Sequence, residues 1–417
     1  MWQSFPGKVK GALVDNLTFL LTMNMPLVSH KNSLSYDTSV PLFKSVLEKI
    51  VSGGIPGALE DCEYTTEETM QRFENIKFKF KNSQIKIPCY RGDTLDRAVV
   101  SFSSGKDSLL SSALAKEMGL NPVLIYVNDT LTPNENRTKQ QFIKKLSLEQ
   151  KLDHVIVKNE LEKLNDFETW NKPQSCLSYT HLLTSFCFVS LPISHAFQAR
   201  YILLGNERNM DYKFKNKDGF ETTPSHDQTK EIMKEQNFMI NTMTGKKMHV
   251  VSLIKPLTTL AIQKILMNRY PDFAKYTMSC CGLDAAPKES RWCHNCSTCF
   301  NVYLYALAFG KNPKDYGFTT NMMSKGMIEL SSVFNGDKLD NYDKSSHARD
   351  EQLLAFYLAY KNGAKGYLMD LFKKQHLKEA KQREDELIKH NLSIQDRSSV
   401  PKELQRKLFS IFNEELN

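Results

Sequence analysis

The sequence predicts an α/β protein built on a doubly wound parallel sheet. Between residues 95 and 275, short runs of continuous apolar residues alternate with segments of helical periodicity. Continuous apolar strands separated by helices are typical of a parallel sheet that is covered on both faces. The flanks differ in character from this region, and at 417 residues the chain is long enough for additions to one core domain. We therefore expect an N-terminal α+β extension over 1–94, a core domain over 95–275, a cysteine-rich knuckle over 276–312 and a helical region over 313–417.

The strands and helices of the core follow from local apolar patterns. Strands are expected at 98–102, 123–127, 154–157 and 201–204, and the fold resumes at 250–257. Helices are expected at 109–118, 138–146 and 260–269. The polar, Lys- and Asn-rich segment 209–246 predicts a mobile surface loop or lid.

The two flanks have their own patterns. In the first, we expect a helix over 42–50 and another that begins near Thr65. Apolar and basic residues alternate over 76–81 and 85–87 around a polar pair, which predicts a β-hairpin. Its Lys-bearing face is either simply solvated or a docking face for a partner. The second flank predicts helices over 353–361, 366–389 and 402–416, the middle one solvated and laced by ion pairs.

Composition and charge describe an ordinary globular protein, with 41% hydrophobic and 24% charged residues and a formal net charge of +8. This charge is compatible with phosphate-bearing ligands but does not require them. The apolar run 11–28 is interrupted by Asp15, Asn16, Asn24 and Pro26, so we expect no signal or membrane segment. Five of the nine cysteines lie within 280–299, which favours metal binding in a reducing cytoplasm over a disulfide framework.

The first strong motif is Ser103-Ser104-Gly105-Lys106-Asp107-Ser108. It follows a β-branched apolar run and precedes a helical pattern, so it predicts a strand, a tight loop and a helix. Such a loop presents free backbone N–H groups at a helix N-terminus, where anions bind. The serine hydroxyls add donors and Lys106 adds positive charge, so the simplest ligand is a phosphate chain. The Walker A pattern is not met, because Asp107 follows Lys106.

Two further loops are expected at the same edge of the sheet, because ligands of such sheets sit beyond the carboxyl ends of the strands. Asn128 follows the second expected strand and is a candidate contact for the adenosine part of a nucleotide. Gly205 follows the fourth and opens the segment Gly205-Asn206-Glu207-Arg208. Ordinary turn chemistry explains either loop equally well when it is taken alone.

The second strong motif is the cysteine cluster. Three cysteines at x2 spacing place three thiolates on one knuckle, and an upstream cysteine completes a tetrahedral shell for Zn²⁺. The expected ligands are Cys280, Cys293, Cys296 and Cys299. Cys281 is the alternative fourth ligand, His294 is a competing one, and an iron–sulfur cluster also fits four cysteines. With four protein ligands the metal has no open position, so its role is structural.

These motifs resemble those of a known enzyme family. The loop is similar to the Ser-Gly-Gly-x-Asp-Ser signature of PP-loop ATP pyrophosphatases, with Ser104 in place of the first Gly. That replacement makes a steep backbone turn at Ser104 less favourable. Together with the cysteine spacing, the loop resembles the 7-cyano-7-deazaguanine synthase (QueC) family over about 96–310, the Lys255-Pro256-Leu257 turn included. The resemblance implies a sheet of the HUP/PP-loop type and a zinc knuckle over 276–312.

The resemblance also implies a chemistry. Members adenylate 7-carboxy-7-deazaguanine with ATP and Mg²⁺, release pyrophosphate, and let ammonia attack the acyl adenylate to give an amide and then a nitrile. Phosphate binding would fall to Ser103, Ser104, Gly105 and Ser108. Lys106 would offset charge on the phosphates, and Asp107 would orient the loop or hold Mg²⁺. Lys106, Asp107 and Ser108 are thus the implied catalytic residues.

Departures from that family leave the second half-reaction open. The Gly-Arg-Asn element of nitrile synthases is missing from the corresponding segment 177–181, and both flanks are unlike the compact members. QueC-like proteins also occur in phage-defence gene sets, where the amine acceptor can be another protein instead of ammonia, and large flanks would suit docking such a partner. The other class to weigh is a PP-loop enzyme that thiolates or adenylates tRNA. Against it, the positive charge is not gathered into a compact patch, so nucleic acid is not the expected ligand.

Overall fold

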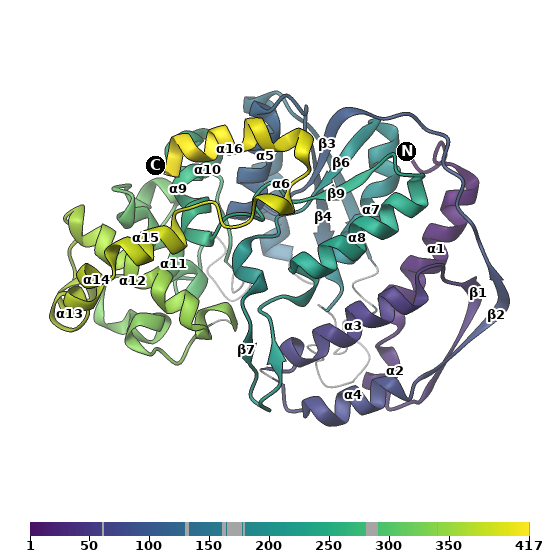
Figure 1. Ribbon diagram of the computed structural model, residues 1–417, viewed down its shortest axis with the longest axis horizontal. Coiled ribbons are helices and arrows are strands. Elements are labelled where there is room, and N and C mark those ends of the chain that lie inside the picture. The colour runs from purple at the N-terminus through teal and green to yellow at the C-terminus, as the bar shows by residue number, and fades with distance from the viewer. Residues whose placement is uncertain are drawn as a thin grey trace.

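The computed structural model describes residues 1–60, 62–129, 133–160, 164, 177, 180–280, 291–339 and 341–416. At its centre lies a five-stranded sheet in which every pair of neighbours is parallel (Figure 1). Its strands, in spatial order, are β5 (Asp153–Asn159), β4 (Val123–Asp129), β3 (Leu95–Ser101), β6 (Ala199–Leu203) and β9 (His249–Val251). Counted along the chain this order is 3-2-1-4-5, so it reverses between β3 and β6. The predicted α/β class with a parallel sheet is confirmed.

Both faces of the sheet are buried, which explains the continuous apolar strands. On β3, Ala98 and Val100 belong to one hydrophobic core and Val99 belongs to the other. This is the alternation expected of a pleated strand. All three side chains are fully buried.

The first core contains helices from the middle and the end of the chain. They are α5 (Lys106–Glu117), α6 (Pro133–Gln150), α9 (Thr259–Arg269), α11 (Ser297–Ala308), α12 (Ser346–Lys361) and α16 (Lys402–Leu416). Phe356 of α12 and Phe412 of α16 lie in the same cluster as Val100. The C-terminal helices therefore share the core of the sheet.

The second core contains helices from the start and the middle of the chain. They are α1 (Gly7–Thr22), α3 (Lys44–Ala58), α7 (Leu182–Ala196) and α8 (Lys230–Thr244). In Figure 1 these helices lie on the opposite side of the sheet from α5 and α9. Phe19 and Leu47 of the N-terminal region share this cluster with Val99 and Ile202 of the sheet.

The predicted β-hairpin is wrong. Residues 77–85 form one strand, β2 (Lys77–Ile85), which pairs in parallel with β1 (Ser33–Val40). The apolar side chains of β2 explain its place, since Phe78 and Phe80 both contact the ring of Phe19. The polar pair Asn82-Ser83 is accommodated as a register irregularity and not as a turn.

The predicted mobile lid over 209–246 is also wrong for much of its length. It contains a short hairpin, β7 (Phe214–Lys215) and β8 (Glu221–Thr222), and then α8. The hydroxyl of Thr229 caps α8, and Gly245 ends it in the left-handed conformation. Met239, Ile240 and Met243 are fully buried against the sheet. The prediction failed because α8 is amphipathic: the polar and basic residues of its outer face gave the segment a composition typical of a loop.

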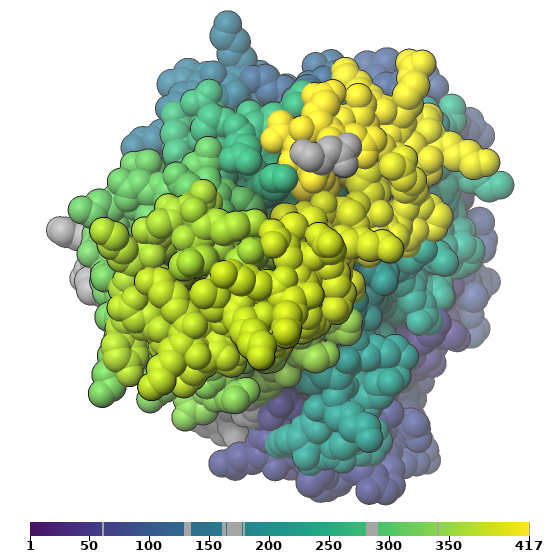
Figure 2. Space-filling model, turned by 60° about the vertical axis from the view of Figure 1, so that its left-hand side comes forward, coloured from purple at the N-terminus to yellow at the C-terminus, as the bar shows by residue number. Residues whose placement is uncertain are grey.

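The expected long helix over 366–389 is three helices, α13 (Tyr367–Gln375), α14 (Leu377–Gln382) and α15 (Glu384–Asn391). They fold back on α12, where Arg383 pairs with Asp350 at 2.6 Å and Glu379 pairs with Arg349 at 2.8 Å. Figure 2 shows these helices, in yellow-green, as one continuous surface next to α16. The remaining α-helices in the described part of the chain are α2 (Met25–Ser29), α4 (Thr66–Glu74) and α10 (Pro271–Ala274).

Among the described residues, one segment, Gly7–Ser29, is long and apolar enough to cross a membrane on length and composition alone. It comprises α1 and α2, and 61% of its most apolar window is buried inside the protein. Its polar residues have partners, since Asp15 pairs with Lys86 at 2.9 Å and Asn16 accepts from the amide of Phe43 at 3.0 Å. Core helices of soluble proteins pass the same test, so the cytoplasmic location stays a prediction.

Candidate functional site

The loop over residues 103–108 joins β3 to α5, as the sequence predicts. We call it the phosphate loop after the ligand that the sequence predicts for it. Ser104 has a φ of +57°, in the left-handed region, and its side chain is fully buried. The hydroxyl of Ser108 accepts from the amide of Ser103 at 3.2 Å and donates to the carbonyl of Gly105 at 3.1 Å. Ser108 thus braces the loop from inside. Ser104 takes up a backbone conformation for which Gly is better suited.

Lys106 lies at the first position of α5 and is held between two carboxylates. Its ammonium group donates to both oxygens of Asp107, at 2.8 and 2.9 Å, and to Oε1 of Glu207 at 3.1 Å. Glu207 comes from the loop after β6, and its side chain is only 5% exposed. The three charged groups therefore meet where the strand order reverses, between β3 and β6. In open α/β sheets this position is where ligands bind.

Burial and neighbouring charges shift the pKa values of this group. Burial would lower the pKa of Lys106, but the carboxylates of Asp107 and Glu207 outweigh it and raise that pKa, so the amine stays charged. Burial raises the pKa of Asp107 to about 7, with Lys106 acting in the opposite direction and Glu207 adding to the shift. The carboxyl of Asp107 therefore titrates near neutral pH.

Gly205 permits the approach of the β6 loop to the phosphate loop. A Cβ atom at residue 205 would lie 2.8 Å from the Cβ of Asp107. The structure thus brings Gly205 together with the phosphate loop, as expected. Asn128, near the end of β4, accepts a hydrogen bond from Gln140 at 3.0 Å, and among the described residues no hydrogen bond joins its side chain to the phosphate loop. Residues 178 and 179, part of the segment 177–181 from which the Gly-Arg-Asn element is missing, lie outside the described residues.

A cavity of about 250 Å³ opens beside Lys106 and Asp107, and we call it the loop cavity. Its other walls come from α9, α11 and the 3₁₀ turn Asn341–Lys344. Val302 and Tyr305 of α11 give it an apolar side. Gln263 of α9 also lines it, fully buried, and neither of its amide atoms has a hydrogen-bond partner among the described residues. An unpaired buried carboxamide costs about 1–3 kcal/mol, so this wall is suited to a polar ligand edge.

Sequence reasoning missed several of these residues. Glu207 was named only as part of a loop, and Gln263 lies inside a helix with no local signal for a site. Lys255 was noted only in a turn, yet its buried ammonium donates to the carbonyl of Glu207 at 2.9 Å and pairs with Asp211 at 3.0 Å. The only sequence signal for the contact between Lys255 and Glu207 was a lysine within an apolar stretch and followed by Pro.

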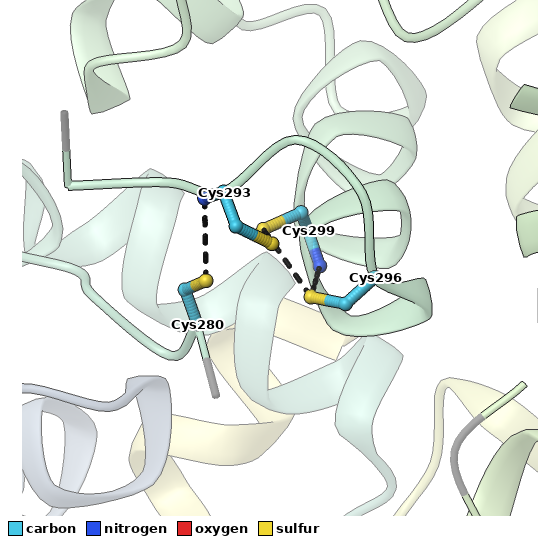
Figure 3. A group of neighbouring side chains, drawn as sticks. All are labelled: Cys280, Cys293, Cys296 and Cys299. Atoms are coloured by element: carbon cyan, nitrogen blue, oxygen red, sulfur yellow. Dashed lines mark hydrogen bonds between the residues drawn. The ribbon is translucent and has the colours of Figure 1, made fainter. Parts of the chain in front are cut away.

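The cysteine cluster is assembled as the spacing predicts (Figure 3). The four sulfur atoms of Cys280, Cys293, Cys296 and Cys299 lie within 4.8 Å of one another. Cys296 caps the N-terminus of α11, which places Cys299 in its first turn. Backbone amides donate to the sulfurs, as from Cys293 to Cys280 at 3.3 Å and from Cys299 to Cys296 at 3.4 Å. Such bonds stabilise the thiolate form that a metal requires.

The distances fit a tetrahedral metal site. A zinc ion with Zn–S bonds of about 2.3 Å separates its sulfurs by about 3.8 Å. The sulfurs of Cys293 and Cys299 are 3.8 Å apart, and those of Cys296 and Cys299 are 3.4 Å apart. The cluster can therefore bind a metal such as zinc, and four thiolates leave it no open position.

The other candidate ligands are not part of this group as described. His294 accepts a hydrogen bond at Nε2 from the amide of Thr319 at 3.3 Å, and its φ of +57° turns the knuckle. Cys281 lies outside the described residues. Elsewhere Cys62 is disulfide-bonded while Cys89 and Cys187 are free, so the cysteines outside the cluster do not share one redox state.

The cysteine cluster is joined directly to the phosphate loop. The amide of Met278, two residues before Cys280, donates to the carbonyl of Ser104 at 2.8 Å. The hydroxyl of Ser279 accepts from the amide of Lys106 at 3.4 Å and also lines the loop cavity. A metal that fixes Cys280 would therefore fix the strained turn at Ser104.

No protein-family model matches the chain, and no curated protein matches it significantly.

Proposed function

We propose that the protein activates a carboxylate with ATP by adenylation and releases pyrophosphate. The observation that carries this proposal is the group Lys106, Asp107 and Glu207 at the point where the strand order reverses. It combines a helix N-terminus, a largely buried ammonium, the buried carboxylate of Glu207 and the partly buried carboxylate of Asp107 beside a cavity. Phosphate chains bind to such a helix N-terminus, and positioning with charge stabilisation is what phosphoryl or nucleotidyl transfer needs.

Each part of the loop has a role in this proposal. The backbone N–H groups of Ser104 and Gly105 and the hydroxyl of Ser103 bind the phosphates, and Ser108 holds the loop in shape. Lys106 offsets negative charge on the phosphate chain. Asp107 and Glu207 supply the hard oxygen ligands that Mg²⁺ prefers. When bound, Mg²⁺ would supply positive charge to the pyrophosphate as it leaves.

The reaction balances without any oxidant or reductant. A carboxylate oxygen of the acid attacks the α-phosphorus of ATP, and the bond from that phosphorus to the bridging oxygen breaks, so pyrophosphate leaves with the electron pair. An amine nitrogen then attacks the acyl carbon, and AMP leaves with the oxygen that came from the acid. The amine loses a proton as the amide forms. AMP is a far better leaving group than oxide, which is why the acid is activated first.

The loop cavity is the proposed site for the body of the acid. Val302 and Tyr305 suit a flat apolar ring, and the unpaired amide of Gln263 suits a donor and an acceptor side by side. 7-Carboxy-7-deazaguanine, the acid implied by the QueC-like motifs, offers such an edge.

The amine acceptor has two candidates, ammonia and a protein amine. The chain has a long C-terminal region after its sheet domain, and two residues of that region, Tyr342 and Asp343, line the loop cavity. A flank that reaches the site is consistent with an acceptor that docks there, as in the phage-defence branch of QueC-like proteins. Zinc in the cysteine cluster would be structural in either case.

The test is product analysis by mass spectrometry. Purified protein is incubated with ATP, Mg²⁺ and 7-carboxy-7-deazaguanine, first alone, then with ammonia, then with proteins encoded beside its gene. We expect AMP and pyrophosphate, and an amide or a protein conjugate in one of the last two arms. ADP and phosphate as products would contradict the proposal. A salt-sensitive complex with tRNA, together with AMP formation on tRNA alone, would support the tRNA-modifying alternative instead.

A further inference from the structure

Glu351, in the middle of α12, is a fully buried carboxylate outside every motif of the sequence. Three groups donate to it. The amide of Leu260 donates to Oε1 at 2.6 Å, and Oε2 accepts from Tyr342 at 2.8 Å and from Asn209 at 3.0 Å. A buried carboxylate this well satisfied fixes the groups that donate to it.

From Glu351 a chain of hydrogen bonds leads to Lys106. Asn209 gives its second amide hydrogen to the hydroxyl of Thr259 at 2.8 Å. Thr259 gives its only hydrogen to Oε2 of Glu207, also at 2.8 Å. The other carboxylate oxygen of Glu207, Oε1, accepts a hydrogen bond from the ammonium group of Lys106 at 3.1 Å.

The direction of this chain depends on Glu351. The carbonyl oxygen of the Asn209 side chain is buried and has no hydrogen-bond partner among the described residues. Its amide could therefore turn over, except that the oxygen would then face the carboxylate of Glu351. With the amide held, Thr259 must accept from Asn209, so its own hydrogen is directed to Glu207.

We propose that Glu351 is a positioning residue of the phosphate-loop site. Through Asn209 and Thr259 it fixes the orientation of the Glu207 carboxylate, which accepts a hydrogen bond from Lys106. This inference rests on the proposed function, because Lys106 is there the cation that binds phosphate. It also gives the C-terminal region a part in the reaction. A helix that begins about 240 residues after the loop orients the ammonium group at its centre.

The test replaces one hydrogen-bond acceptor of Glu351 by a donor without changing the shape of the side chain. In Glu351→Gln, an NH₂ group faces the NH₂ of Asn209, so the Asn209 amide turns over and its oxygen takes the hydrogen of Thr259. Glu207 loses that donor and Lys106 loses its fixed position. We expect kcat for pyrophosphate release to fall about 10- to 100-fold, while KM for ATP changes less than about 3-fold. Affinity for inorganic pyrophosphate, measured by calorimetry without turnover, should fall about 5-fold.

Two further variants separate positioning from stability. Phe356→Leu disturbs the core under the same helix, away from the hydrogen-bond chain, and should lower the melting temperature with kcat unchanged. Thr259→Val breaks the chain in its middle. If both act on Glu207, Thr259→Val combined with Glu351→Gln loses no more activity than either change alone.

The outcomes distinguish this inference from the proposed function. An active wild type with a Glu351→Gln variant equally active, or losses that simply add in the double variant, would overturn the positioning role alone. A wild type that binds pyrophosphate but makes no AMP would overturn the adenylation proposal, and the affinity of Glu351→Gln would still decide the positioning role. A wild type that binds neither ATP nor pyrophosphate would overturn both.

Discussion

The cysteine cluster and the phosphate-loop site are neighbours that were built in different ways. The cluster takes all its ligands from one short segment, Cys280 to Cys299, and they are of one chemical kind. The loop site takes Lys106 and Asp107 from one segment, but Glu207 follows a different strand and Glu351 comes from a C-terminal helix. The charged groups of the loop site come from several segments that only the tertiary structure brings together. The thiolates of the cluster are brought together by their spacing in one segment.

Because of this difference, substitutions in the two regions should have different effects. A closed tetrahedral site contributes folding energy outright. A cation between two carboxylates contributes chiefly to function, because ion pairs of this kind add little net stability. Changes in the cluster should therefore unfold the region, and changes in the loop should leave a folded, inactive protein.

The largest expected effect is on the cluster. Cys299→Ser should release the bound metal and lower the melting temperature by more than about 10 °C, since structural zinc contributes on the order of 10 kcal/mol of binding energy. Metal content by mass spectrometry and thermal unfolding measure this. Cys187→Ser is the matched control, because Cys187 is equally buried but lies outside the cluster. A Cys299→Ser protein with one metal per chain and the control's stability would contradict the site.

The next effect is on the loop. Asp107→Asn should lower the rate of pyrophosphate release about 1000-fold, roughly 4 kcal/mol of transition-state stabilisation, because Lys106 loses one of its two counter-charges. The metal content and the melting temperature should stay near those of the wild type. Asp96→Asn, an exposed carboxyl on the same strand-loop unit, is the control. Equal rates in the two variants would remove Asp107 from the site.

A smaller effect is expected from pH. Because burial raises the pKa of Asp107 to about 7, its carboxylate form is lost as the pH falls through that value. Burial also raises the pKa of Glu351 to about 7, so the profile reports both groups. We expect kcat for pyrophosphate release to rise from pH 6 to pH 8, and Asp107→Asn to flatten that rise. A wild-type rate that is constant from pH 5.5 to 8.5 would contradict the role of these carboxyls.

The smallest effect concerns the turn at Ser104. Ser104→Gly relieves the left-handed backbone and removes a buried hydroxyl that has no hydrogen-bond partner among the described residues. It should stabilise the protein by up to about 1 kcal/mol and leave pyrophosphate release intact. Ser112→Gly, within the regular helix α5, should instead destabilise it by about 0.5–1 kcal/mol. Denaturant unfolding of the two variants compares them, and a Ser104→Gly protein as unstable as Ser112→Gly would show that the turn is not strained.

The same contrast explains how much could be predicted from the sequence. The parallel sheet and the four cysteines were predictable, because buried strands and metal ligands leave patterns over a few residues. The pairing of β1 with β2 was not, since it depends on Phe19 and Tyr36, which are remote in sequence. Nor was α8, whose polar outer face dominates its composition. Gln263 and Glu351 carry no local signal, because only tertiary structure brings them to the loop. Glu207 was indicated only as a member of the loop after a strand, and not as the partner of Lys106.

Isotope transfer distinguishes the proposed adenylation of a carboxylate at the loop site from other ways of cleaving ATP. The acid is labelled with ¹⁸O in its carboxylate and incubated with ATP, Mg²⁺ and the acceptor amine, and the AMP formed is analysed by mass spectrometry. Attack by the acid on the α-phosphorus predicts one ¹⁸O atom in the phosphate of AMP. AMP without the label, or a label that appears in phosphate released with ADP, would contradict the account.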